Sequence, residues 1–293
     1  MDQLSTIILA AALIIIMLGM GLSLVAADFQ RIFRHPKAIL VGLTNQIILL
    51  PLIGFALAVS FPIQPEIAIG LMILAACPGG PTSNLIAHLA KGNTALSVTL
   101  TALSSLITII TIPFIVNIAL IHFLEQGQMI QLNVLETILQ ILVIIVIPIS
   151  IGMLIRRYRP GFALKMGNPV RKASGVVMML VIAGLIVKER ANVLSYFQQA
   201  GIIALCLNII TMLVGYYSAK LINVTDKSAL SIAIESGIQN GTLAITIAVV
   251  LLENNAYAIT PAIYSLLMFL TGGVVIYWGL RKSKAAYRSK AVT

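Results

Sequence analysis

The stretch CPGGPTSN, at residues 77–84, lies near the middle of an apolar run that covers residues 66–90. Pro78 and Pro81 flank a glycine pair, and an α-helix cannot continue through them because proline lacks a backbone donor and clashes with the preceding turn. At membrane depth, lipid offers no partner for the backbone groups that such a break leaves free. We therefore expect this stretch to be enclosed by protein or to line a polar cavity.

The composition is typical of a protein that lies largely within a membrane. Of the 293 residues, 59% are apolar and 10% are charged, whereas soluble domains carry about 25% charged residues. This balance excludes a soluble, disordered or fibrous protein. Cys77 and Cys206 both lie in apolar runs, so the sequence contains neither a disulfide framework nor a zinc motif. We expect an all-α polytopic membrane protein.

Nine apolar runs are long enough to cross a bilayer, which takes about 20 residues in a helix. They cover residues 5–27, 38–60, 66–90, 94–122, 134–155, 173–187, 200–220, 227–252 and 257–279. The sixth is short, which leaves open an extension upstream past Lys172 or a small tilt. The stretch 77–84 interrupts the third of these spans. The chain then divides into a first half, residues 1–122 with spans one to four, and a second half, residues 123–293 with spans five to nine.

The eighth span contains a second interrupted stretch, ESGIQNGT at residues 235–242, which is polar and carries two glycines. Each half of the chain therefore has one broken helix. Because the third and eighth spans are an odd number of crossings apart, the two broken helices run in opposite directions. This arrangement is typical of inverted-repeat transporters, in which two discontinuous helices meet near the middle of the membrane. The sequence predicts such a pair, with its helices crossed.

The basic residues predict the orientation of the chain. All 19 Lys and Arg residues except Lys188 and Arg190 fall on one side of the nine-span arrangement, and cytoplasmic loops collect such residues. We therefore expect the N-terminus outside and the C-terminus in the cytoplasm. The same rule explains the net charge of +10 without a nucleic-acid partner. With no organelle transit signal, we expect a multi-pass protein of the bacterial inner (plasma) membrane.

Glu235 is the one acidic residue well inside a predicted span. Insertion scales assign about 2.5–3.5 kcal/mol to an ionised side chain at the centre of a membrane helix unless a partner compensates it. No Lys or Arg lies well inside a span to act as that partner. A bound cation is the simplest compensation, and protonation of the carboxylate is the next.

The interrupted stretches resemble those of the bile acid:sodium symporter family. The similarity rests on Cys77-Pro78-Gly79-Gly80 followed by Ser83-Asn84, and on the run Glu235-Ser236-Gly237-Ile238-Gln239-Asn240. Supporting matches are Gly19-Met20-Gly21-Leu22, Asp28-Phe29, His35-Pro36, Gln46, Lys91-Gly92-Asn93 and Leu96-Ser97. The similarity covers almost the whole chain, and the family includes members with nine spans.

The resemblance implies a core domain of spans two to four and seven to nine, and a panel domain of spans one, five and six. It implies transport by movement of one domain against the other, with two sodium ions as co-transported ligands and no other metal or cofactor. The residues implied for the first sodium site are Ser83, Asn84, Ser97, Thr101 and Glu235. Those implied for the second are Gln46, Glu235 and Gln239, with the backbone carbonyls of Ser236 and Ile238. All of these ligands are hard oxygen donors, as a hard cation requires.

The positions that would face the substrate depart from those of relatives. Pro81 follows the glycine pair where several bacterial relatives have Thr, and Thr82 comes one place later. Phe269 and Leu270 stand where some relatives have polar residues. Asn240 is kept, so the candidate substrate contacts are Pro81, Thr82 and Asn240. We call the region where the two broken helices are expected to cross the crossover. The implied substrate is an organic anion, either bile-acid-like or a small carboxylate, because helix N-termini at the crossover favour negative charge.

Other functions compete with a sodium-coupled symporter. A proton-coupled or potential-driven exporter of organic anions or metalloids would share the broad fold, and Cys77 would then matter more than sodium. A receptor would need a soluble domain, for which the predicted loops are too short, and the sequence shows no His/Asp/Glu cluster of the kind an enzyme uses. We expect a monomer in the lipid bilayer, with Asn117 and Asn208 in inter-helix hydrogen bonds.

Overall fold

A computed structural model describes residues 3–30, 36–124, 134–188 and 193–290 of the chain, and the regular elements of these ranges are helices. In chain order they are α1 (Gln3–Ser23), α2 (Ala26–Gln30), α3 (Pro36–Thr44), η2 (Asn45–Leu49), α4 (Leu50–Ser60), α5 (Pro65–Ala76), α6 (Pro81–Leu89), α7 (Thr94–Phe123), α8 (Val134–Ile141), η4 (Leu142–Val146), α9 (Ile147–Tyr158), α10 (Pro160–Lys188), α11 (Val193–Leu221), α12 (Asp226–Gly237), α13 (Gly241–Thr246), η5 (Ile247–Leu251), η6 (Ala256–Ala258) and α14 (Ile259–Lys290). The elements η2 and η4 are π-helical turns inside longer helices, and η5 is a π-helical turn at the end of the helix that begins with α13, a form that is frequent at functional sites.

Five of the described helices are long and apolar enough to cross a bilayer. They are Pro36–Ser60, Thr94–Phe123, Leu135–Tyr158, Leu194–Leu221 and Ala256–Ser283. These five correspond to the second, fourth, fifth, seventh and ninth predicted spans, while α1 and α10 occupy the first and sixth. The third and eighth predicted spans are each divided into shorter helices, α5 with α6 and α12 with α13. Their interruption by glycine and proline was the expectation from the sequence.

Helix α10 is longer than the predicted sixth span. It begins at Pro160, so that only Arg159 separates it from α9, and the basic stretch 160–172 is helical rather than a loop. Proline suits the first helical position because the donor it lacks would have no partner there. Lys, Arg and Met are good helix formers, and long basic side chains can reach polar surroundings from within a helix. The extension upstream past Lys172, which the sequence leaves open, is therefore present. Helix α14 likewise continues beyond the ninth predicted span, to Lys290.

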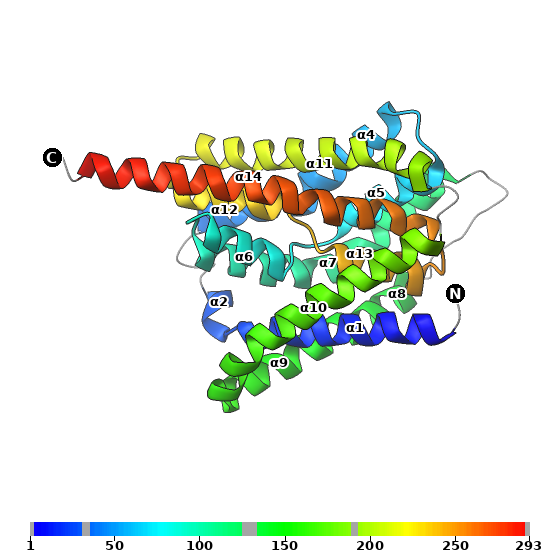
Figure 1. The fold of residues 1–293 in the computed structure, drawn as a ribbon, viewed down its shortest axis with the longest axis horizontal. Helices are drawn as coiled ribbons and strands as arrows, with labels where there is room; N and C mark the ends of the chain where they lie inside the picture. Colours follow the sequence, from blue (N-terminus) through cyan, green and yellow to red (C-terminus); the bar gives the residue numbers. More distant parts are fainter. Residues whose placement is uncertain (1–2, 31–35, 125–133, 189–192, 291–293) are drawn as a thin grey trace.

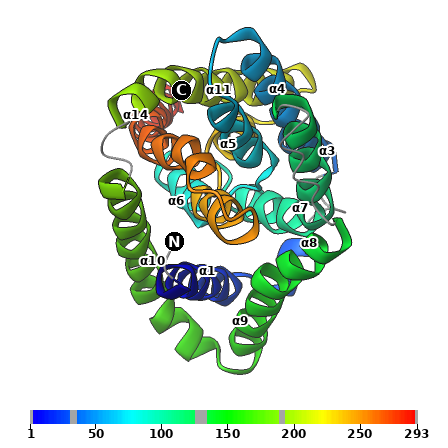
Figure 2. The same ribbon diagram turned by 90° about the vertical axis from the view of Figure 1, so that its right-hand side faces the viewer.

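Helices α1, α9 and α10 lie together on one side of the molecule, and α5, α7, α11 and α14 lie on the other (Figures 1 and 2). The first group packs closely because α1 and α9 meet at glycines. A Cβ atom on Gly21 would collide with the carbonyl oxygen of Ile149, and one on Gly152 would collide with that of Leu18. Small residues allow this close approach between membrane helices. In Figure 1, α1 begins and α14 ends at opposite ends of the long axis.

The two helix breaks contact each other in the interior. Gly79 pairs with Gln239 in an isolated antiparallel bridge, and the backbone N–H of Asn240 donates to the carbonyl oxygen of Pro78 over 2.9 Å. All residues of α5 and α12 except the first two of each are buried. Protein therefore encloses both breaks, as the backbone groups freed there require.

Candidate functional site

Glu235 lies in the last turn of α12 and is only 1% exposed. Its carboxylate accepts hydrogen bonds from three hydroxyl groups. Ser83 Oγ on α6 donates to Oε1 over 2.7 Å, Thr101 Oγ1 on α7 donates to Oε2 over 2.9 Å, and Ser97 Oγ on α7 donates to Oε1. These partners are at least 134 residues away in the sequence, so the packing of α6 and α7 against α12 builds this arrangement.

The side chain of Asn84 completes the cluster. Its carbonyl oxygen Oδ1 lies 2.9 Å from Ser97 Oγ and 3.2 Å from Thr101 Oγ1, so it is an alternative acceptor for both hydroxyls. The structure thus brings together all five residues that the sequence assigns to the first sodium site. We refer to Ser83, Asn84, Ser97, Thr101 and the Glu235 carboxylate as the carboxylate cluster.

The hydroxyl groups of the carboxylate cluster have more acceptors than protons. Ser97 and Thr101 each lie within hydrogen-bonding distance of both Glu235 and Asn84. Ser83 lies 2.7 Å from both Glu235 and the carbonyl oxygen of Gly80. A hydroxyl group carries one proton, so several oxygen lone pairs face one another without a proton between them. A small hard cation can satisfy such a set of oxygen atoms.

Gly79 provides the space in which the carboxylate lies. A Cβ atom at this position would collide with Glu235 Oε2, and it would lie 3.1 Å from Gln46 Nε2 and 3.3 Å from Ser83 Oγ. At the neighbouring Gly80, a Cβ atom would meet Asn240 at 3.5 Å, which is ordinary contact. The sequence predicts Gly79 only as a helix breaker. Its second role, close approach of backbone to a functional group, follows from the folded arrangement.

The residues assigned to the second sodium site surround the backbone at the end of α12. Gln46 on η2 donates through Nε2 to the carbonyl oxygen of Glu235 over 3.4 Å. Gln239 donates to the carbonyl oxygens of Glu235 and Ser236 over 3.2 and 2.8 Å, and Ile238 lies two residues beyond Ser236. The Oε1 atoms of Gln46 and Gln239 are buried and have no hydrogen-bond partner among the described residues. Leaving a buried acceptor unpaired costs about 1–3 kcal/mol, so this site favours a ligand that binds amide oxygens.

The three candidate substrate residues lie at the breaks themselves. Asn240 is 5% exposed and caps α13, because its Oδ1 accepts from the N–H of Leu243 over 3.1 Å. Its Nδ2 is buried without a partner among the described residues. Pro81 and Thr82, both half-buried, form the first turn of α6. The group therefore contains one buried donor that is free to bind an acceptor.

A cavity of about 210 Å³ lies between α1, α7 and the η4–α9 helix. Its lining residues are Met20, Leu24, Phe29, Ala102, Ser105, Leu106, Ile145, Val146, Ile149, Ser150 and Met153. The lining is mostly apolar and does not include Pro81, Thr82 or Asn240. Ser105 connects it to the carboxylate cluster, since its Oγ donates to the backbone carbonyl of Thr101 over 2.7 Å.

Asn208 makes the inter-helix hydrogen bond expected from the sequence, whereas Asn117 has a buried carbonyl oxygen without a partner among the described residues. The Nδ2 atom of Asn208 donates to the carbonyl oxygen of Gly237 over 2.6 Å. Tyr264 on α14 donates to the same oxygen, also over 2.6 Å. No pattern in the sequence distinguishes Tyr264 from other span tyrosines, although a buried tyrosine hydroxyl generally needs a partner.

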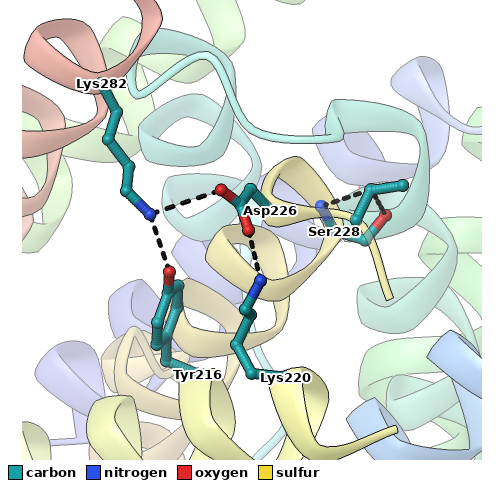
Figure 3. Close-up of polar contacts among 6 residues, drawn as sticks. Tyr216, Lys220, Asp226, Ser228 and Lys282 are labelled. Atoms are coloured by element: carbon teal, nitrogen blue, oxygen red, sulfur yellow. Dashed lines mark hydrogen bonds and ion pairs between the residues drawn. The ribbon is translucent and has the colours of Figure 1, made fainter. Parts of the chain in front are cut away.

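A separate charged group lies at the other end of α12 (Figure 3). Asp226 forms ion pairs with Lys220 at 2.6 Å and Lys282 at 3.5 Å, and Lys282 also donates to the hydroxyl of Tyr216 over 2.9 Å. The hydrogen bond from Lys220, followed by the positive charge of Lys282, lowers the pKa of Asp226 below its ordinary value. This group joins α11, α12 and α14 at the surface and takes no part in the crossover.

The fold and the crossover together define a class of protein. Apolar helices able to cross a bilayer, two broken helices in contact, and a buried carboxylate among oxygen donors describe a membrane transport protein. The chain matches the sodium bile acid symporter family over residues 10–197, which is more than half of its length, and it belongs to that family. The resemblance inferred from the crossover motifs is confirmed.

Individual relatives match most of the chain. An uncharacterized sodium-dependent transporter of Bacillus subtilis, YocS, is 30% identical over 94% of this chain and 84% of its own. The ileal sodium/bile acid cotransporter of Homo sapiens is 29% identical over 97% of this chain and 82% of its own. A probable chloroplastic sodium/metabolite cotransporter of Oryza sativa subsp. japonica is 27% identical over 90% of this chain, which spans 62% of that relative's length. The names agree on sodium and differ in the substrate.

Proposed function

We propose that this protein is a sodium-coupled symporter that carries an organic anion across the membrane by alternating access. The observation that carries the proposal is the surplus of buried oxygen acceptors around Glu235. The hydrogen-bond donors to its carboxylate are neutral hydroxyl groups rather than Lys or Arg. A buried carboxylate with neutral partners is stabilised by a cation, and membership in a sodium symporter family supports sodium as that ion.

The proposed first sodium ion is bound by the carboxylate cluster, in which the hydroxyls of Ser83, Ser97 and Thr101 turn their lone pairs toward the ion. The proposed second ion is bound by the amide oxygens of Gln46 and Gln239, with Glu235 and the backbone carbonyls of Ser236 and Ile238. These ligands are carboxylate, amide, carbonyl and hydroxyl oxygens, the donor types that hard cations prefer.

Sharing Glu235 between two ions supports an anionic substrate. Two sodium ions bring two positive charges, and Glu235 supplies one negative charge. The loaded crossover therefore carries a net positive charge in surroundings where charge is poorly screened. A carboxylate on the substrate neutralises that charge, so ions and anion bind better together than apart. This mutual stabilisation provides the coupling that symport requires.

Sodium accounts for the site better than the proton that an exporter would use. A proton on Glu235 would add one donor to the carboxylate cluster. It would leave Gln46 Oε1 and Gln239 Oε1 unpaired, because both are acceptors that do not contact the carboxyl oxygens in the hydrogen bonds described. A second cation pairs them directly.

The proposed substrate is a small carboxylate, held in part by Asn240. The buried and unpaired Nδ2 of Asn240 is a donor of the kind that binds a carboxylate oxygen. The cavity of about 210 Å³ is smaller than the roughly 300–1,000 Å³ of most small-molecule sites. Its volume suits a small acid better than a bile acid. Asn240 does not line this cavity, so the cavity is proposed to hold the body of the acid and Asn240 to bind its carboxylate. Pro81 and Thr82 are proposed to border the substrate on the side of α6.

The proposed moving parts are a panel of α1, α8–α9 and α10 and a core of the remaining spans. The cavity lies between α1 and α9 on one side and α7 on the other, which is where the two bodies would separate. We propose inverted halves at residues 1–122 and 123–293, an outside N-terminus and a bacterial plasma membrane. All proposed ligands come from one chain, so a monomer is sufficient.

Transport into proteoliposomes tests the proposal. Radiolabelled small carboxylates and a bile acid are offered with an inward gradient of sodium, of potassium, or of protons. We expect sodium-driven uptake of a small carboxylate by the wild type and none by Glu235→Gln. Uptake at the same rate with potassium, or uptake driven by the proton gradient alone, would contradict sodium coupling.

A further inference from the structure

The carbonyl oxygen of Gly237 is bound by two side chains that come from different helices. Asn208 Nδ2 on α11 and the Tyr264 hydroxyl on α14 each donate to it over 2.6 Å. The two side chains also contact each other, with 3.2 Å between Asn208 Nδ2 and the Tyr264 oxygen. Asn208 and Tyr264 are both 0% exposed. Three helices therefore meet at one backbone atom.

The Gly237 carbonyl oxygen lies between two backbone carbonyls of the proposed second sodium site. Gly237 stands between Ser236 and Ile238, whose carbonyls are proposed ion ligands. Both lone pairs of the Gly237 oxygen are already engaged, so this carbonyl is not itself a ligand. The N–H of the same peptide unit, which belongs to Ile238, donates to the carbonyl oxygen of Ile234 over 2.8 Å. Because a peptide unit is planar, these contacts at both ends determine its orientation.

Close packing of α11 against α12 makes the contact with Asn208 possible. A Cβ atom on Gly237 would collide with the side chain of Met212, and one on Gly215 would lie 2.6 Å from Ser236 Oγ. Glycine at both positions therefore lets the two helices approach, as small residues do in membrane bundles. This approach brings the Asn208 amide to the end of α12.

Packing alone does not explain an asparagine at position 208. Its Oδ1 atom is buried and has no partner among the described residues, which destabilises the fold relative to an apolar side chain of the same size. Its donor group, in contrast, binds Gly237 at short distance. The side chain thus contributes through its interaction with the crossover backbone.

We infer that Asn208 and Tyr264 are positioning residues for the second sodium site. They hold the Gly237 carbonyl away from the ion and thereby keep the neighbouring carbonyls of Ser236 and Ile238 directed toward it. Neither side chain touches the ion. This inference rests on the proposed sodium coupling, and it predicts an effect on sodium affinity that is separate from an effect on folding.

Two substitutions and a matched control test the inference. Tyr264→Phe removes the hydroxyl and keeps the ring, and Asn208→Leu removes the amide at similar volume. The control is Thr260→Val, because Thr260 lies one turn before Tyr264 on α14, is fully buried, and also donates to a backbone carbonyl, that of Ile67, over 3.0 Å. The melting temperature of each purified protein is titrated with sodium chloride against potassium chloride at constant ionic strength.

For Tyr264→Phe and Asn208→Leu, we expect the half-saturating sodium concentration to rise about fivefold, as the loss of one hydrogen bond of ordinary strength implies. Their melting temperatures in potassium should stay close to that of the wild type, and Thr260→Val should bind sodium normally. A purely structural role would lower the melting temperature in potassium and leave the half-saturating concentration unchanged, which would overturn the inference.

The inference is also overturned if Thr260→Val weakens sodium binding as much as Tyr264→Phe does. If the wild type itself shows no sodium effect, the proposed function fails, and the inference fails with it in a distinguishable way. Either variant is sufficient for the test, since both remove a donor from the same carbonyl. If Asn208→Leu does not yield folded protein, the sodium titration of Tyr264→Phe, which retains the ring, tests the inference alone.

Discussion

Replacing Glu235 with glutamine removes the buried charge while keeping the shape of the side chain. The new carbonyl oxygen still accepts hydrogen bonds from Ser83 and Ser97. The new amide nitrogen can donate to the hydroxyl of Thr101, because a hydroxyl accepts as well as donates. We therefore expect the variant to fold. In potassium it should be at least as stable as the wild type, since it no longer buries a carboxylate that lacks a counter-ion.

Sodium should reverse this order. An ion that binds only the folded protein stabilises it by about 2.7 kcal/mol at a hundredfold excess over Kd. At about 2–4 °C per kcal/mol for a chain of more than 150 residues, one ion raises the wild-type Tm by roughly 5–11 °C. Both proposed sites use the Glu235 carboxylate, so the variant should lose most of the rise. The two melting curves are expected to cross as sodium replaces potassium.

The assay is the Tm of detergent-purified protein along a sodium-for-potassium series at constant ionic strength. Asp226→Asn is the matched control, because it also removes one carboxylate from α12 but at an exposed ion pair. This control should keep the full sodium response. Equal responses of wild type and Glu235→Gln would refute the reasoning, as would an equal loss of response in Asp226→Asn.

Three further results are expected. Gly79→Ala places a methyl group against the Glu235 carboxylate and should weaken sodium binding at least about tenfold, the equivalent of 1.4 kcal/mol. Gly80→Ala is the control and should bind sodium normally. A normal sodium titration of Gly79→Ala would count against the site. Ala102→Phe fills the cavity and should abolish substrate uptake in proteoliposomes while the sodium-dependent rise in Tm remains; unimpaired uptake would place the substrate elsewhere. The lowered pKa of Asp226 means that its ion pairs stabilise the protein above the ordinary carboxyl pKa of about 3.9 and stop doing so as the pH falls through the lowered value. A pH series of Tm should therefore show Asp226→Asn slightly less stable than the wild type at neutral pH, by no more than about 1 kcal/mol because the pair is exposed, and equal to it in strong acid; a difference that grows in acid would contradict this sign.

The helix breaks could be predicted from the sequence because they depend on local chemistry. Pro78 and Pro81 flank Gly79 and Gly80, and each proline in a helix interior removes a hydrogen bond and costs about 3 kcal/mol whatever the fold. Single prolines are tolerated inside α7 and α10, so it is the combination with the glycine pair that predicts the break. Apolar runs of span length predict membrane helices whatever their neighbours. An intramembrane acidic residue such as Glu235 indicates a functional site because its transfer into lipid is unfavourable everywhere. The same local reasoning could not decide where α10 begins, since basic residues are compatible both with a loop and with a helix end.

Which residues surround Glu235 depends on tertiary packing. The sequence names Ser83, Ser97 and Thr101 only through resemblance, because hydroxyl residues are common in membrane helices and carry no distinguishing pattern. Their convergence on one carboxylate, from at least 134 residues away, exists only once α6 and α7 pack against α12. The space left by Gly79 and the two donors on the Gly237 carbonyl likewise have no counterpart in the spacing of the chain.

The sequence by itself therefore determined that this chain forms membrane helices, that two of them break, and that a carboxylate lies beside the second break. Each of these properties follows from a residue and its chain neighbours in apolar surroundings. Only the tertiary structure decided which oxygens face Glu235, that these acceptors outnumber the hydroxyl protons beside them, and where a cavity of about 210 Å³ is left. Those features arise from contacts between distant segments, whose distances are set by how all the helices fill space together.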